Sequence, residues 1–369
     1  MTSPAPVDGR DLLPWSILDL APVHRGETAA TALAGTVALA RRAESLGYRR
    51  VWYAEHHNIP RIASAATSVL IAHVAAHTTT IRLGAGGIML PNHAPLTIAE
   101  QFGTLAVLHP GRIDLGVGRA PGTDQRTLRA LRRSPAAAER FPDDVLELQG
   151  YLAGRSLVPG VEAVPGAGTG VPITILGSSL FGARLAAELG LPYAFASHFA
   201  TAALHQAVEA YRSGFRPSPA CERPYVIAGM NAIAASTEAE AQVLLRGAAR
   251  SRAKLVFGRP GRRLTDEEAD LVLDSPSGAP AWEMLRYSAV GTPEPARQQL
   301  GRFAAEAEVD EVIIASIAPE RDAALRTIEL LAGAARAAQD QAPADPPVPA
   351  APAVPEAPER GTAGPTAGP

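Results

Sequence analysis

The strongest constraint on the fold is an alternation between short apolar segments and longer segments rich in alanine and leucine. The short segments have the length and the β-branched or aromatic content of strands, and most are apolar at every position. Eight such segments occur, at 15–20, 50–53, 81–89, 113–117, 173–176, 193–196, 225–233 and 312–315. Uninterrupted apolar strands are typical of parallel sheets that are covered on both faces. We therefore expect an α/β protein.

The segments between the predicted strands have helical composition. They cover 28–46, 63–76, 96–108, 179–189, 201–211, 237–253 and 321–337. Eight strands with helical crossovers in a core of roughly 330 residues favour a (β/α)8 TIM barrel over an open sheet. The second and sixth strands are each preceded by a helix ending in glycine, Gly47 and Gly190, where a left-handed residue would cap the helix. The same glycine-capped helix thus recurs four strands later, and a repeat at that spacing fits a closed ring of eight strands.

Three stretches depart from the alternation. Long loop insertions are expected at 119–171, after the fourth strand, and at 257–310, before the eighth. Long loops at the carboxyl ends of barrel strands often cover the substrate, although the second stretch could be additional helix on the outside. The barrel domain is predicted at 12–340. The segment 341–369 is rich in proline and alanine and is expected to be a disordered tail.

Charge and hydropathy limit the partners. The formal net charge is -3, which argues against nucleic acid as a partner, since the affinity of a nucleic-acid-binding surface rests on excess lysine and arginine. The apolar runs are strand-sized, far short of a bilayer span, and the first residues lack the basic start and apolar core of a signal peptide. We expect a cytoplasmic protein that acts on a small molecule.

Two rare residue types limit the chemistry further. Cys221 is the only cysteine, so one chain cannot form an internal disulfide, a thiolate zinc site or a cysteine-ligated cluster. Lys254 is the only lysine, and its surroundings lack the Gly-Lys-Ser/Thr sequence of a phosphate-binding P-loop. Chemistry must therefore depend on histidine, carboxylates, arginine, the backbone or a bound cofactor.

The densest polar cluster is Glu55-His56-His57, at the carboxyl end of the second predicted strand. Catalytic groups of TIM barrels gather at that end, and histidine suits proton transfer near neutral pH. We take all three as catalytic candidates, with a purely structural role as the alternative. Adjacent residues leaving a strand point to opposite faces, which disfavours a shared metal ion. His198, after the sixth strand, is a weaker candidate for the same cavity.

The third strand contains an unusual run, Gly84-Ala85-Gly86-Gly87. Glycine weakens a strand and often marks a place where a ligand or another backbone approaches closely. A flat ligand against Gly86 and Gly87 would account for the run. A bulge that only relieves barrel curvature is the alternative.

An anion site is predicted between the fourth and fifth strands. The run 116–122 has the wrong glycine spacing for a dinucleotide fingerprint, but Arg119 leaves a strand end there and could clamp an anion. Ser178 and Ser179 open the helix after the fifth strand, where free N–H groups and the helix dipole favour phosphate. The alternatives are a solvated or ion-paired arginine at the rim and a simple serine N-cap.

Taken together, these runs resemble the bacterial-luciferase-like, flavin-dependent monooxygenases. The matching segments are 54–57, 84–91, 111–119, 178–179 with 190–192, and 291–294, in order over most of 14–337. The resemblance implies a (β/α)8 barrel that forms a homodimer. By position, His56 is similar to the family's catalytic histidine.

The resemblance also implies a cofactor and its site. Arg119, Ser178 and Ser179 fall where the family holds the flavin phosphate, and Gly86-Gly87 matches a non-prolyl cis peptide against the isoalloxazine. The implied activity is a two-component monooxygenase. A separate flavin reductase would supply reduced FMN as cosubstrate, and a flavin hydroperoxide would oxygenate a mostly apolar organic substrate.

One departure and three alternatives qualify this reading. Gly118 stands where luciferase has a cysteine, so light emission from an aldehyde is not implied. The alternatives are a deazaflavin-dependent oxidoreductase, a metal-assisted barrel hydrolase using His56 with an acid such as Asp114, and a flavin-binding protein without catalysis.

Overall fold

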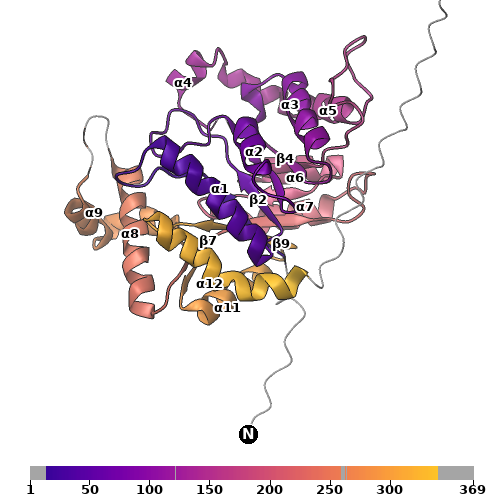
Figure 1. The fold of residues 1–369 in the computed structure, drawn as a ribbon. Coiled ribbons are helices and arrows are strands. Elements are labelled where there is room, and N and C mark those ends of the chain that lie inside the picture. The colour runs from indigo at the N-terminus through magenta and orange to yellow at the C-terminus, as the bar shows by residue number, and fades with distance from the viewer. Residues whose placement is uncertain (1–13, 121, 259–261, 263, 340–369) are drawn as a thin grey trace, which may run out of the picture.

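Nine parallel strands form one sheet, and eight of them close into a barrel (Figure 1). The computed structural model describes residues 14–120, 122–258, 262 and 264–339, so the predicted tail at 341–369 lies outside them. The strands are β1 (Trp15–Asp19), β2 (Arg50–Tyr53), β3 (Arg82–Met89), β4 (Ile113–Gly118), β5 (Ile173–Gly177), β6 (Tyr193–Phe195), β7 (Val226–Ala234), β8 (Ser288–Gly291) and β9 (Glu311–Ser316). All eight predicted strands are present, and β8 is an addition.

Strand pairing shows how the ring closes. Neighbouring strands follow chain order from β1 to β7, and β9 pairs with both β7 and β1. The pairing is parallel throughout, for example with Ile17 opposite Val51 and Tyr193 opposite Val226. β8 pairs with the carboxyl half of β7 outside the ring. The predicted TIM barrel is therefore confirmed.

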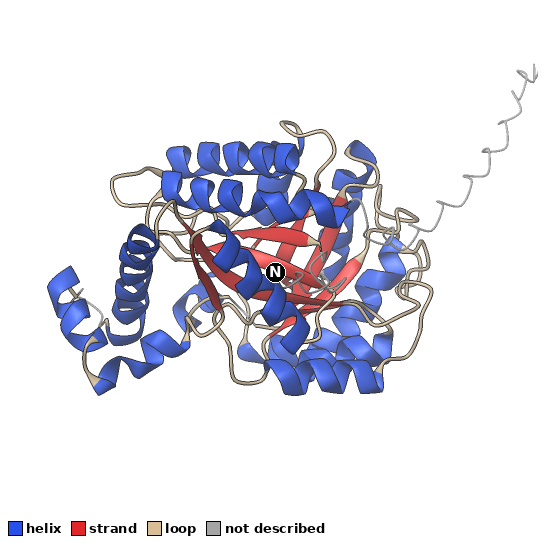
Figure 2. Cartoon of the chain, turned by 90° about the horizontal axis from the view of Figure 1, so that it is seen from below, coloured by secondary structure: helices blue, strands red, loops and turns tan. Residues whose placement is uncertain are grey.

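Helices enclose the strands, as Figure 2 shows in blue around red. They are α1 (Ala29–Leu46), α2 (Thr67–Ala75), α3 (Pro95–Leu108), α4 (Gln125–Ala130), α5 (Phe141–Leu152), α6 (Leu180–Leu189), α7 (Leu204–Gly214), α8 (Glu238–Phe257), α9 (Asp266–Leu273), α10 (Ala279–Glu283), α11 (Pro293–Glu306) and α12 (Arg321–Gln339), with short 3-10 helices at Leu90–Asn92, Pro135–Arg140 and Pro276–Gly278. Gly47 and Gly190 take the predicted left-handed conformation after α1 and α6. Among the described helices, none has the length and apolarity to cross a membrane.

The two long insertions contain regular structure. The first, at 119–171, holds α4 and α5, and α5 packs on α3. The second, at 257–310, holds α9, α10, β8 and α11. For the second insertion we had expected either a long loop or additional helix, and the structure shows mainly helix. Small buried residues of α8, including Ala249 and Ala253, pack with Ala269 of α9.

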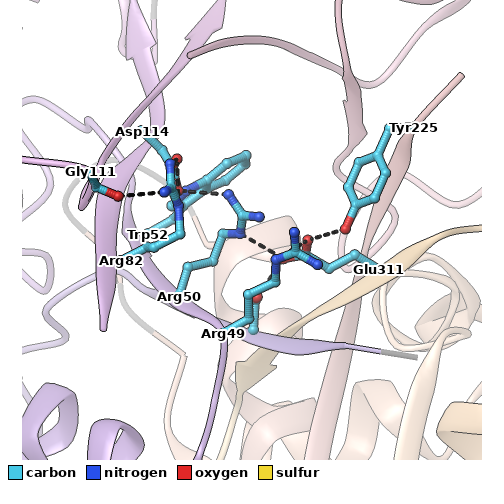
Figure 3. Close-up of polar contacts among 9 residues, drawn as sticks. Arg49, Arg50, Trp52, Arg82, Gly111, Asp114, Tyr225 and Glu311 are labelled. Atoms are coloured by element: carbon cyan, nitrogen blue, oxygen red, sulfur yellow. Dashed lines mark hydrogen bonds and ion pairs between the residues drawn. The ribbon is translucent and has the colours of Figure 1, made fainter. Parts of the chain in front are cut away.

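A buried charge network occupies the barrel floor, which we define as Arg50, Arg82, Asp114 and Glu311 (Figure 3). These residues lie at the amino-terminal ends of β2, β3, β4 and β9, respectively. Arg50 contacts Asp114 at 2.7 Å and Glu311 at 3.0 Å, and Arg82 also binds Asp114. The Tyr225 hydroxyl donates to Glu311 at 2.7 Å. Each buried charge thus has an opposite charge in contact, as a dry interior requires.

Titration of the barrel floor follows from these contacts. Burial alone would raise the pKa of Asp114, but the attraction of Arg50 and Arg82 outweighs it and lowers this pKa to about 2. Burial alone would lower the pKa of Arg50, but Asp114 and Glu311 raise it. Asp114 and Arg50 therefore stay charged at neutral pH. Asp114 is therefore a structural ion-pair partner at the amino-terminal end of the barrel, opposite the end where catalytic groups of TIM barrels gather.

Candidate active site

Inside the barrel, side chains become smaller toward the carboxyl ends of the strands. Leu18, Trp52, Ile227 and Ile313 share a buried cluster with smaller residues, separate from the larger core between sheet and helices. Because side chains alternate across a strand, residues two positions further along face the same way. Those positions hold Ala54 after β2, Gly229 on β7 and Ala315 on β9, whereas the position after β1 holds the larger Leu20. The small side chains leave the carboxyl end as the side suited to a ligand.

The Gly86–Gly87 peptide on β3 is cis, as the resemblance implied. A Cβ at Gly87 would lie 2.7 Å from the Gly116 carbonyl oxygen, and one at Gly86 would lie 2.9 Å from the Trp52 Cβ. Neither position has room for a side chain. The register between β3 and β4 also shifts between Ala85 and Ile88, so the bulge that was the alternative is present as well.

Glu55 is the centre of a hydrogen-bond cluster between β2 and β3. Its buried carboxylate accepts from His57 Nε2 at 2.8 Å, from His93 Nε2 at 2.9 Å and from the Met89 N–H at 2.9 Å. Burial alone would raise its pKa, but the bonds from His93, His57 and Met89 lower it. Glu55 is thus an ionised anchor that ties the segment after β2 to the segment after β3.

His56 differs from its two neighbours in having no such partner. Its ring is partly buried, and its Nδ1 is a buried atom without a hydrogen bond in the described part of the chain. Burial lowers its pKa below the usual 6.5, with Glu55 opposing and His57 assisting this shift. At neutral pH the ring is uncharged. A neutral imidazole without a protein partner is the form that can accept a proton.

Arg119 lies beside the start of α6, as the anion-site prediction requires. Its guanidinium stacks on the Phe181 ring at 4.2 Å from the centroid, and its Nε donates to the Ala138 carbonyl at 3.0 Å. Phe181 belongs to the first turn of α6, directly after Ser178 and Ser179. Arg119 is exposed and makes no ion pair with any described residue, so of its two alternatives only a solvated arginine remains.

The two serines leave the helix start uncapped. Ser179 is the N-cap residue of α6, but its side chain makes no capping hydrogen bond. Both serines are exposed. The simple N-cap that was the alternative is therefore absent, and two hydroxyls and the first N–H groups of α6 remain for an anion.

The two residues named for the metal-hydrolase alternative lie at opposite ends of the barrel. Asp114 belongs to the barrel floor and is held by two arginines, whereas His56 follows the carboxyl end of β2. Among the described residues, no group of three histidine, cysteine or carboxylate side chains is arranged to hold a metal ion.

Two site residues were not foreseen from the sequence. His93 follows the 3-10 turn after β3, and Phe181 lies in the first turn of α6. The position of His93, shortly after a strand's carboxyl end, is the same signal that indicated His56 and could have identified it. The contact between Phe181 and Arg119 joins segments far apart in sequence and has no local signal.

Comparison with known proteins gives consistent likenesses. A family model described as luciferase-like monooxygenase matches residues 15–311. The chain is 47% identical over 318 residues to a luciferase-like monooxygenase of Escherichia coli (strain K12), covering 86% of this chain and 95% of that protein. It is 43% identical over 193 residues to N-acetyl-S-alkylcysteine monooxygenase of Bacillus subtilis (strain 168), covering 49% of this chain and 56% of that protein.

Solved structures share the fold. The crystal structure of apo-MsnO8 matches with a TM-score of 0.80 and 34% identity, covering 89% of this chain and 98% of the other. A type II Baeyer-Villiger monooxygenase in complex with FMN matches with a TM-score of 0.66 at 17% identity, covering 87% and 96%. At that identity the likeness concerns the fold alone.

Proposed function

This chain belongs to the luciferase-like monooxygenase family and is a flavin-dependent monooxygenase, and we propose that its flavin is reduced FMN. The observation that carries the proposal is the position of Arg119, which is exposed and makes no ion pair with any described residue, beside the uncapped start of α6. A guanidinium, two hydroxyls and free N–H groups together suit the terminal phosphate of FMN.

The residues at the barrel mouth fit the rest of the cofactor. The bare backbone of Gly86–Gly87 would lie against the flat ring system, because no side chain stands between them. Arg119, Ser178 and Ser179 would hold the phosphate. When bound, reduced FMN supplies the electrons with which dioxygen is activated.

We assign the proton-transfer role to His56. Its neutral ring would accept a proton from the substrate or donate through a bound water as charge develops. Glu55 and His57 would act as positioning residues, because their mutual hydrogen bond, together with His93, fixes the segment that carries His56. The wall of apolar and small side chains would keep water away from the reacting centre.

The proposed substrate is a mostly apolar organic molecule. Large apolar side chains are exposed on segments after three barrel strands: Ile59 after β2, Phe181 after β5 and Phe199 after β6. Such a rim favours entry of an apolar group. The name of the Bacillus subtilis relative makes N-acetyl-S-alkylcysteines the first compounds to test.

Two partners complete the proposal. We infer that a separate flavin reductase supplies the reduced FMN, because the sequence carries no Rossmann fingerprint for a nicotinamide cofactor. We also infer a homodimer. Turnover should then require an added reductase in addition to NADH and FMN, and sedimentation should give twice the chain mass.

The phosphate assignment predicts a selective loss in an Arg119 variant. Arg119→Met should weaken FMN binding roughly 10- to 100-fold, because a hydrogen bond to a charged group contributes about 1.5–3 kcal/mol. Riboflavin binding should change little. Flavin fluorescence titration measures both, with Arg129→Met on α4 as the charge-matched control. Equal affinity of the native protein for riboflavin and FMN would show that no phosphate site exists, and binding of a deazaflavin without FMN would favour the deazaflavin alternative.

A further inference from the structure

A second histidine faces the barrel mouth from the side opposite His56. His56 lies three residues beyond the end of β2, and His198 lies three residues beyond the end of β6. In the closed eight-stranded ring these strands are four places apart and therefore on opposite sides. Each ring has a buried Nδ1 without a hydrogen bond among the described residues. A histidine with a purely structural role would be expected to use that nitrogen.

The surroundings of His198 are shaped to hold the ring. A Cβ at Gly229 on β7 would lie only 2.3 Å from its Nδ1, so the ring occupies space that any other residue would fill. The Asn231 amide donates to the His198 carbonyl at 2.8 Å, and the Ser197 hydroxyl donates to the Gly229 carbonyl at 2.6 Å. The His198 ring also packs edge-to-face with the Phe199 ring, with 4.9 Å between the two ring centroids. The contacts fix the residue without engaging the ring nitrogens.

Burial, assisted by the charge around it, keeps the His198 ring neutral. Its pKa falls to about 3, mainly because of burial and further because of two positive or potentially positive neighbours, Arg252 of α8 and His56. No carboxylate contributes to the shift. Arg252 is half-buried, and no hydrogen bond or ion pair joins it to another described residue.

Burial also selects one tautomer. Nδ1 packs against the Gly229 backbone with no acceptor in reach, and a buried N–H without an acceptor is less tolerable than a buried lone pair. The proton of the neutral ring is therefore on Nε2. Nε2 is not among the buried unpaired atoms and has no protein partner among the described residues, so it reaches the accessible surface.

We propose that His198 contacts the substrate and donates a hydrogen bond from Nε2–H to an acceptor oxygen, a carbonyl or a carboxylate, across the mouth from His56. This rests on the proposed function, because it requires the substrate to lie between β2 and β6. The positive charge of Arg252, which is close enough to His198 to act on it electrostatically, favours the carboxylate. His198 then distinguishes substrates that carry such an oxygen from those that do not.

Nitrogen-15 NMR of histidine-labelled protein tests the tautomer without any cofactor. The His198 signal, assigned by its loss in His198→Asn, should show a protonated Nε2 and an unprotonated Nδ1 at pH 7. His24 and His77 are internal controls of the opposite kind, because their Nδ1 atoms lie 2.7 and 2.8 Å from carbonyl oxygens and must donate. A protonated Nδ1 in His198 would overturn the proposal.

Two small probes then test recognition. Acetate and acetamide carry the carboxylate and the carbonyl, respectively, and one or both should shift the His198 signal saturably. In Arg252→Gln, acetate binding should fall several-fold and acetamide binding should not. In Gly229→Ala the ring is displaced and both responses should weaken. No response to either probe in the native protein would refute the proposal.

A flavin measurement separates this proposal from the proposed function. His198→Leu should bind FMN within about twofold of the native affinity, while oxygenation of a substrate with an acceptor oxygen should lose efficiency mainly through KM. His198→Gln should restore part of it. If the native protein fails to bind FMN, the proposed cofactor is wrong, and the probes still decide whether His198 recognises an acceptor. A parallel loss of FMN binding in His198→Leu would instead make His198 a cofactor residue.

Discussion

Replacing His56 with alanine is expected to lower turnover by about two to four orders of magnitude, the range that positioned proton transfer contributes. The reason is that the His56 Nδ1 has no hydrogen-bond partner among the described residues and burial lowers the pKa of the ring. FMN affinity should stay within about threefold, since the proposed phosphate site lies on β4, β5 and α6. Single-turnover product formation with reduced FMN and oxygen, beside a flavin titration, measures the two effects separately.

The pH profile gives a second reading of the same residue. His56 must be neutral to accept a proton, and burial holds its pKa below 6.5. The rate should therefore be constant through neutral pH and fall only as the pH drops through a value below 6.5. This acid limb should disappear in His56→Ala.

A matched histidine controls for general effects of the substitution. His77→Ala removes an exposed ring at the end of α2, whose contact is with its own helix, and should leave turnover unchanged. Turnover of His56→Ala within about threefold of the native rate would remove His56 from the mechanism. A loss of turnover explained wholly by weaker FMN binding would do the same.

The sequence was sufficient to predict the barrel because burial on both faces leaves a strong local pattern. β1 to β7 and β9 are nearly all apolar, and each predicted segment overlaps the observed strand. β8 was missed for the same reason: Ser288–Gly291 is short, half-buried at alternate positions and paired only with the end of β7. Helices within the insertions were missed because their pattern is interrupted by turns and prolines.

At the site, the sequence was enough to predict which residues follow each strand, but not which of their side chains contact one another. The prediction of β2 alone was enough to place Glu55, His56 and His57 at its carboxyl end. It was also enough to predict that adjacent side chains there point to opposite faces. That Glu55 would be engaged by His93 depends on a 3-10 turn after β3, which brings a distant residue back. Likewise, Arg119 follows from β4, but its stacking on Phe181 depends on how β4 and β5 pair.

Replacing Asp114 with asparagine is expected to destabilise the barrel by about 3–5 kcal/mol, the usual cost of removing one partner from a buried ion pair. The Asp114 side chain is 3% exposed and is the shared partner of Arg50 and Arg82. Without its charge, Arg50 keeps only Glu311 as a carboxylate partner in the barrel floor. Urea denaturation at pH 7 measures the loss, and Glu162→Gln on the exposed surface should change stability by less than about 0.5 kcal/mol.

The pH dependence of this difference identifies its cause. The pKa of Asp114 is lowered from 3.8 to about 2 on folding, so its charge stabilises the native state fully above about pH 4. That contribution is lost as the pH falls from 4 toward 2, and the native and Asp114→Asn proteins should converge there. A stability gap that persists unchanged at pH 2 would point to packing rather than to charge. Loss of turnover in Asp114→Asn at unchanged stability would instead place Asp114 in the chemistry and restore the hydrolase alternative.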